Sequence, residues 1–262
     1  MTQATIQAVV PDKRSGIAPW LHGWLTMLRW EITNFRLLLP VMVAAQILLG
    51  AGFVLGIGLL FDQIPLLAAT YLSTGAIVVT LISVGLIVGP QLVAQQKAQK
   101  VYDFMWSLPV PRSSAAAAWI SLNVVIAIPG MLVALLAASW RYGIDFDVTW
   151  AIVPAVGLTL LCGTMLGYAL AHAIPKPDVT QLVSQLLIFL VVGFAPINFP
   201  PENLPGWLAS AHEYLPFVHM ATVVRDAMVD GLVSGVSRSY VILSVWTMGA
   251  AAIAAVVLGR RP

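Results

Sequence analysis

The run PLLAATYLSTGAIVVTLISVGLIVGPQLV, residues 65–93, contains 29 residues and no Asp, Glu, Lys or Arg. A helix needs roughly 20 mostly apolar residues to cross the hydrocarbon core of a bilayer, so this run is long enough to span a membrane. Five other stretches are equally free of charge, at residues 37–60, 115–138, 149–173, 179–198 and 239–259. The sequence therefore predicts an all-α polytopic membrane protein with six transmembrane helices.

The composition of the whole chain agrees with a membrane protein. Hydrophobic residues make up 60% and charged residues 9%, whereas about a quarter of the residues in soluble domains are charged. The net charge of +2 is too small to suggest a nucleic-acid partner, and one cysteine, Cys162, cannot form a disulfide within the chain. No Cys/His spacing resembles a metal site. We expect a mobile cytoplasmic tail without a signal peptide at residues 1–16, and one transmembrane domain at residues 17–262.

Charge bias between the two sides predicts the orientation. Because the number of predicted spans is even, both termini lie on one side, and most basic residues fall on that side. Basic residues favour cytoplasmic loops, so we expect cytoplasmic termini in the cytoplasmic (inner) membrane. The ten basic residues on the side of the termini are Lys13, Arg14, Arg29, Arg36, Lys97, Lys100, Arg112, Lys176, Arg260 and Arg261.

Two further segments are helical in pattern but do not span. Residues 17–35 place Trp20, Trp24 and Met27 near helical spacing, with Arg29 among the polar residues between them. This pattern predicts an amphipathic interfacial helix with its Trp side chains at headgroup depth, although an extended first membrane helix remains an alternative.

The other segment, residues 199–238, is too polar to cross the bilayer and too apolar for an ordinary loop. Pro205 and Pro216 can each open a short helix at its first turn. Phe217 begins an apolar face of the second helix, while Arg225 and Asp226 fall on its opposite, polar face. We expect an external re-entrant hairpin of two short helices before the last span.

The loop between the second and third spans, VYDFMWSLPVPR (101–112), carries large apolar residues where the charge bias predicts cytoplasm. This loop, the external motif NLPGWL…YLPF…VVRDAMVDG (203–231) and the order of the spans resemble the permease subunit of type 2 ATP-binding-cassette (ABC) exporters. The resemblance covers nearly the whole chain. One difference is Gln95-Gln96-Lys97, where members of that family often carry a Glu. A membrane-surface turn with no partner is the alternative for residues 102–108.

The resemblance implies sites on both sides of the membrane. It implies a cytoplasmic coupling helix that docks on an ATPase, formed by Tyr102, Asp103, Phe104, Met105, Trp106, Leu108 and Arg112. The interfacial helix would bear on the same partner through Trp20, Trp24 and Arg29. The external hairpin would act as a gate, formed by Trp207, Tyr214, Phe217, Arg225 and Asp226.

The resemblance also implies partners and a function. Two ATPase copies would bind ATP and Mg, and the permease would pair with a second permease copy, identical or related. The chain itself would bind no cofactor and would not be an enzyme. The direction, export, is implied by the resemblance alone. The neutral, aliphatic spans suit an amphipathic or lipophilic substrate such as a drug, antibiotic, lipid or lipid-linked glycan. A secondary carrier or channel is the main alternative, and a membrane-embedded enzyme is a weaker one.

Overall fold

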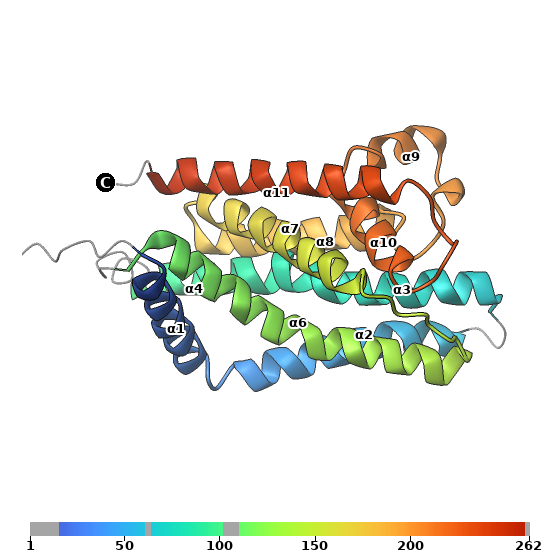
Figure 1. Cartoon of the computed structure of the whole chain (residues 1–262), viewed down its shortest axis with the longest axis horizontal. Helices are drawn as coiled ribbons and strands as arrows, with labels where there is room; N and C mark the ends of the chain where they lie inside the picture. The colour runs from blue at the N-terminus through green and yellow to red at the C-terminus, as the bar shows by residue number, and fades with distance from the viewer. Residues whose placement is uncertain (1–15, 61–63, 102–109, 260–262) are drawn as a thin grey trace, which may run out of the picture.

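A bundle of long helices makes up the computed structural model, which describes residues 16–60, 64–101 and 110–259 (Figure 1). Within these ranges there is no strand, and six helical stretches are long and apolar enough to cross a membrane. Each coincides with a predicted span, which confirms the fold class. The six are α2 (Leu39–Leu60), α3 to α4 (Leu66–Ala98), α6 (Arg112–Tyr142), α7 (Ile152–Ala173), α8 (Pro177–Phe194) and α11 (Val236–Gly259).

The second span runs through the centre of the bundle. It consists of α3 (Leu66–Ser83), a π-helical turn at Val84–Val88, and α4 (Gly89–Ala98). Every residue of α3 from Ala69 onward is buried, because α2, α6, α7 and the short helix α10 surround it. A helix that is apolar on all sides is expected in such a position, and the quoted run has no polar face.

Glycine lets the π-turn approach α7 closely. A Cβ added to Gly85 would collide with the backbone of Gly163, and one added to Gly167 would collide with the carbonyl of Gly85. Gly85 and Gly167 thus allow close helix packing within the chain. Gly52 and Gly56 of α2, which have the same four-residue spacing as Gly163 and Gly167, face open space in the described residues.

The two ends of the bundle carry different short helices (Figure 1). At one end, α1 (Ile17–Asn34) lies beside the last turns of α4 and the start of α6. At the other end are a 3-10 turn at Pro201–Asn203, α9 (Gly206–His212) and α10 (Pro216–Asp226). Pro205 immediately precedes α9 and Pro216 is the first residue of α10, so the two predicted short helices are confirmed, and their external location stays a prediction.

Some predicted boundaries are wrong by a few residues. α6 begins at Arg112 rather than 115, directly after Pro111, and continues to Tyr142 rather than 138. The residue after the helix, Gly143, is its C-cap and has a φ of 64°, a conformation that glycine adopts without a steric penalty. α8 ends at Phe194, short of the predicted residue 198.

Candidate functional site

The segment predicted to dock on an ATPase lies between α4 and α6, and its neighbours are well described. Lys97 is near the end of α4, and Arg112 is the exposed first residue of α6. The remaining predicted docking residues lie outside the described residues; they are Tyr102, Asp103, Phe104, Met105, Trp106 and Leu108. Residues 1–15 of the predicted tail also lie outside them. The candidate site is therefore built from the helices that flank this segment.

Helix α1 is attached along the first turns of α6. The indole Nε1 of Trp20 donates a hydrogen bond to Ser113 Oγ at 3.0 Å. One turn later, Trp24 Nε1 donates to Ser121 Oγ at 3.1 Å. Gly23 faces the same helix, since a Cβ placed there would lie 3.0 Å from Ser114 Oγ. The start of α6 and helix α1 thus form one packed unit directly after the 102–109 segment.

A buried carboxylate joins α1 to α4. Gly23, Met27 and Glu31 are spaced four residues apart and are the buried residues of α1, so they form its inner face. Gln96 Nε2 in α4 donates a hydrogen bond to Glu31 Oε2 at 3.2 Å. Burial raises the pKa of Glu31 to about 7, and the bond from Gln96 offsets only part of that shift. Burial disfavours the charged form of a carboxyl group, so Glu31 titrates near neutral pH.

The next residue of α4 reaches a different helix. Lys97 Nζ donates to the backbone carbonyls of Ala171 and Ile174, the latter at 3.2 Å. These carbonyls lie at the end of α7, where the last turn leaves acceptors unsatisfied and a cation is favourable. Consecutive side chains of α4, Gln96 and Lys97, therefore connect the helix before the 102–109 segment to α1 on one side and to α7 on the other.

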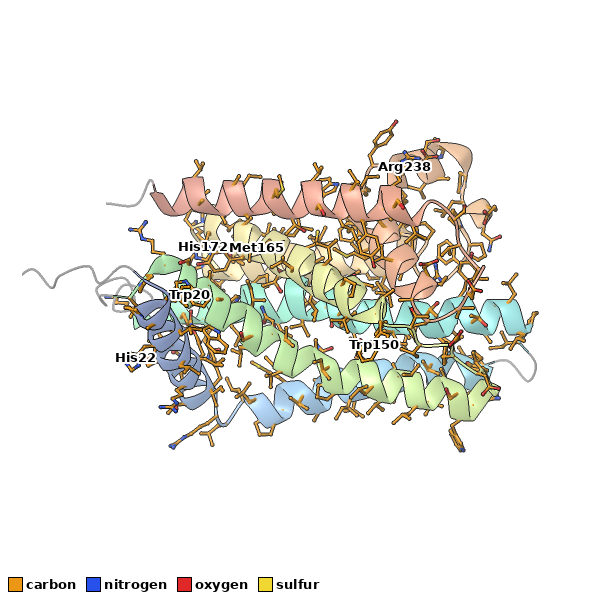
Figure 2. All side chains as sticks on the ribbon, viewed as in Figure 1. Trp20, His22, Trp150, Met165, His172 and Arg238 are labelled. Atoms are coloured by element: carbon orange, nitrogen blue, oxygen red, sulfur yellow. The ribbon has the colours of Figure 1, made fainter. Side chains whose placement is uncertain are left out.

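The structure shows contacts of Trp20 and Trp24 with α6, and their place at the depth of the lipid headgroups stays a prediction. Both side chains are half-buried and hydrogen-bonded to α6, and Figure 2 shows Trp20 on the side of α1 toward the bundle. A separate stripe of exposed apolar residues includes Leu21 and Leu25, while Arg29 is exposed beside other polar residues. The apolar residues of α1 therefore form two faces: one contacts α6 and the other is exposed.

A turn at residues 35–38 separates α1 from α2, which begins at Leu39. Phe35 within this turn is buried. The first membrane helix is therefore not simply extended toward the N-terminus, which was the alternative interpretation of residues 17–35. The separate α1 lies across the end of the bundle at a clear angle to α2 (Figure 1).

At the opposite end, Arg225 of α10 is buried against α3, which corrects its predicted place on a polar face. Its side chain is 2% exposed. Nε donates to Thr74 Oγ1 at 2.9 Å and Nη2 donates to the carbonyl of Ile197 at 2.6 Å. The guanidinium carbon lies 4.1 Å from the centre of the Tyr71 ring. Burial lowers the pKa of Arg225 to about 10, so it stays charged at neutral pH and binds α10 to α3.

The structure does not bring the five predicted gate residues together. Phe217 and Arg225 point inward and are buried, Asp226 is half-buried, and Trp207 and Tyr214 are exposed. The helical spacing of the apolar residues after Phe217 predicts a polar face that holds Arg225 and Asp226. Its real partners come from α3 and from the segment after α8, which the local pattern cannot reveal.

Sequence reasoning missed the bonds made by Glu31, Gln96 and Lys97. One signal was present, since Glu31 follows Met27 by four residues on what is otherwise an apolar stripe. The described residues contain no group of three His, Cys, Asp or Glu side chains able to hold a metal ion. The bonds described above join α1, α4, α6 and α7 around the segment that links α4 to α6.

Comparison with protein-family models supplies an independent finding. The model described as ABC-2 family transporter protein matches residues 60–260, which is most of the 262-residue chain. A search of curated proteins finds no match.

Proposed function

Because this chain belongs to the ABC-2 family of transporter proteins and is a multi-pass membrane permease, we propose that it exports an amphipathic or lipophilic substrate using ATP hydrolysed by a separate subunit. The observation that carries the proposal is the set of bonds around the α4–α6 connection. Gln96, Lys97 and Ser113 attach the two flanking helices to α1 and α7. A displacement of that connection would move four helices together.

The partner is an ABC ATPase, as the family implies. In our proposal, two ATPase copies bind ATP and Mg and close on each other, and each docks on one permease of an identical or related pair. Phe104, Met105, Trp106 and Leu108 insert into the ATPase, with Tyr102, Asp103 and Arg112 at the rim. Buried aromatic side chains tend to dominate such interfaces. In this proposal the ATPase, and not the permease, binds the nucleotide and carries out the hydrolysis.

The spans support an apolar or amphipathic substrate. In the described residues the buried polar side chains of the spans include no Asp, Glu, Lys or Arg, and many bond to their own helix. Thr74 Oγ1, for example, donates to the carbonyl of Thr70 at 2.8 Å. Ion-coupled carriers usually hold ionisable groups at membrane depth, so an external energy source fits these spans better. Drugs, antibiotics, lipids and lipid-linked glycans all belong to the proposed class.

Docking is tested by purifying the full chain from its native host in mild detergent. We expect an ATPase to co-purify, and its identity is checked by mass spectrometry and ATP turnover. Trp106→Ala and Phe104→Asp should each remove most of the bound ATPase. The matched control is Trp150→Ala, because Trp150 is exposed beyond the opposite end of α6 and should leave binding intact. Equal ATPase recovery from all three variants would show that docking occurs elsewhere.

Transport is tested separately in liposomes. Vesicles that contain the chain and its co-purified ATPase should move a fluorescent amphipathic dye in an ATP-dependent manner. Vesicles that contain the chain alone should not. Dye movement without any ATPase would instead support the secondary carrier or channel.

A further inference from the structure

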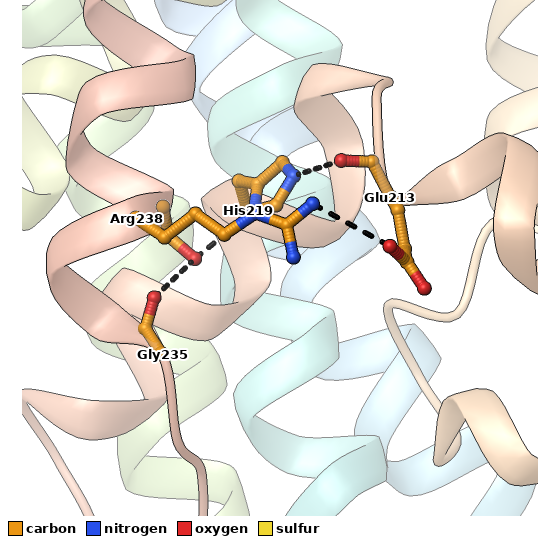
Figure 3. A network of polar contacts seen from close by, with 5 residues as sticks. Glu213, His219, Gly235 and Arg238 are labelled. Carbon is orange, nitrogen blue, oxygen red and sulfur yellow. Dashed lines mark hydrogen bonds and ion pairs between the residues drawn. The ribbon is translucent and has the colours of Figure 1, made fainter.

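A polar cavity of about 290 Å³ lies at the α9–α10 end of the bundle. Its walls come from α9, α10 and α11, and include His212, Glu213, His219, Thr222, Arg238 and Ser239. Figure 3 shows the centre of this cluster, with His219 between Glu213 and the first turn of α11. Pockets for small organic ligands measure about 300–1,000 Å³, so this cavity suits a compact polar group rather than a whole drug molecule.

The cavity lies at the depth of lipid headgroups. Arg238 and Ser239 belong to the first turn of α11, the last membrane-spanning helix, so this is the level at which the chain enters the bilayer. Trp207 on α9 and Tyr214 just after it are exposed. Exposed Trp and Tyr side chains gather at the boundary between lipid and water. A lipid headgroup can therefore reach the cavity without leaving its leaflet.

The two histidines of the cavity are neutral. His219 Nε2 lies 2.9 Å from the carbonyl oxygen of Glu213 and must donate to it, which leaves Nδ1 to accept from Ser239 Oγ at 3.0 Å. Burial lowers the pKa of both His212 and His219. His212 is 6% exposed, and its Nδ1 has no partner among the described residues. This nitrogen is itself buried and does not face a ligand in the cavity, and neither histidine adds a positive charge to the walls at neutral pH.

The fixed charges are one carboxylate and one guanidinium. Arg238 Nη2 and Glu213 Oε2 are 3.4 Å apart, and their side chains are 60% and 58% exposed. An exposed ion pair of this kind contributes little to stability. Arg238 has five N–H donors and Glu213 has two acceptor oxygens, so a single long contact leaves most of their bonding capacity available to a ligand.

We propose that this cavity binds a zwitterionic headgroup that carries both a phosphate and a primary ammonium. Arg238 binds the phosphate through its paired N–H groups, and Glu213 accepts hydrogen bonds from the ammonium. A purely anionic headgroup would meet the Glu213 carboxylate, and a purely cationic group would meet Arg238. The site is independent of the transported cargo and of any ATPase.

Native mass spectrometry of the full chain in detergent tests the site. The probes are phosphatidylethanolamine, phosphatidylcholine and phosphatidylglycerol at equal concentration. We expect phosphatidylethanolamine to be retained preferentially, because the quaternary ammonium of phosphatidylcholine has no N–H to donate and phosphatidylglycerol has no ammonium. Glu213→Gln and Arg238→Gln should each lower this retention about tenfold, which is ~1.4 kcal/mol. The controls Glu202→Gln and Arg36→Gln change exposed residues outside the cavity and should leave it unchanged.

Thermal unfolding in lipid-free detergent checks that the cavity variants are folded. Unchanged retention of phosphatidylethanolamine in both variants would overturn the proposal. So would a preference for phosphatidylglycerol that depends on Arg238 alone. Added glycerophosphoethanolamine, the free headgroup, distinguishes two modes of binding. If it displaces phosphatidylethanolamine, the headgroup alone is sufficient for binding. If it does not, but the Glu213 and Arg238 variants still lose phosphatidylethanolamine, the acyl chains are required as well.

Discussion

At the scale of single residues, the buried charges Glu31 and Arg225 distinguish this chain from a bundle held by apolar contacts alone. Neither has an oppositely charged partner in the contacts described: Glu31 accepts from an amide, and Arg225 donates to a hydroxyl and a carbonyl. Burying a charge is unfavourable unless hydrogen bonds compensate it. These two side chains should therefore respond strongly to substitution.

Glu31→Gln should remove a pH dependence of stability. The pKa of Glu31 is about 7 in the folded chain and 4.5 in the unfolded one, so the folded state holds the proton over that interval. The contribution of Glu31 to the free energy of unfolding is therefore fully present below pH 4.5. It is lost as the pH rises through 7, and the loss is at most about 3 kcal/mol. Thermal unfolding between pH 5 and 8.5 should show this loss in the parent chain and a flatter profile in Glu31→Gln.

The control for this prediction is Asp178→Asn, which changes an exposed carboxylate in the first turn of α8. This variant should keep the pH profile of the parent chain. If Glu31→Gln keeps that profile as well, the Glu31 carboxyl does not titrate in this range.

Arg225→Ala should weaken the attachment of α10 to α3. Bonds from a charged donor contribute about 1.5–3 kcal/mol each and Arg225 donates two, to the hydroxyl of Thr74 and the carbonyl of Ile197, so we expect a loss of roughly 3 kcal/mol or more in the free energy of unfolding. Hydrogen exchange should increase over residues 216–226 in lipid nanodiscs. Arg36→Ala removes an exposed arginine and should change stability by less than about 1 kcal/mol. Equal effects of the two variants would contradict the role of Arg225.

At the scale of elements, the sequence predicts which segments form helices, but it does not predict which helices those segments contact. Apolar runs such as residues 65–93 identify spans because the bilayer demands length and hydrophobicity. The direction of a side chain around a short helix depends on neighbours far along the chain. The sequence of α1 therefore does not reveal that Trp20 and Trp24 donate hydrogen bonds to Ser113 and Ser121 of α6.

Gly85→Ala should disrupt the crossing of the π-turn with α7. A new Cβ would collide with the backbone of Gly163, and backbone cannot move aside as a flexible side chain can. Overpacking of this kind typically destabilises by about 1–3 kcal/mol or more. Gly52→Ala is the matched control, because a Cβ there meets nothing within 4 Å and alanine favours the helix. Folded yield by size-exclusion chromatography should fall for Gly85→Ala and not for Gly52→Ala.

At the scale of the whole molecule, the six spans and the short helices at each end followed from hydropathy and proline placement. The ATPase-docking segment at residues 102–109 lies outside the described residues, so its assignment stays a prediction. The polar cavity at the far end could not be predicted, since its walls come from residues as distant as Glu213 and Arg238.

Cysteine labelling in intact cells tests the orientation of the bundle. His22 and Trp207 are exposed at opposite ends, and the native Cys162 is fully buried. Trp207→Cys should react with a membrane-impermeant maleimide in intact cells. His22→Cys should react only after the cells are permeabilised, and the parent chain should react in neither case. The reverse pattern would place the termini outside.

The π-turn at Val84–Val88 also bears on how the chain tolerates insertions and deletions. A π-turn accommodates an additional residue within an α-helix, so deleting one residue here would still leave a continuous span. Because a π-turn spreads one turn over more residues than an α-helix does, the deletion would return this turn to regular α-helix and change the rotation of α4 relative to α3 only slightly. Gln96 and Lys97 would then still face Glu31 and the end of α7. The same deletion within the regular part of α4 would instead rotate the residues after it by about 100°.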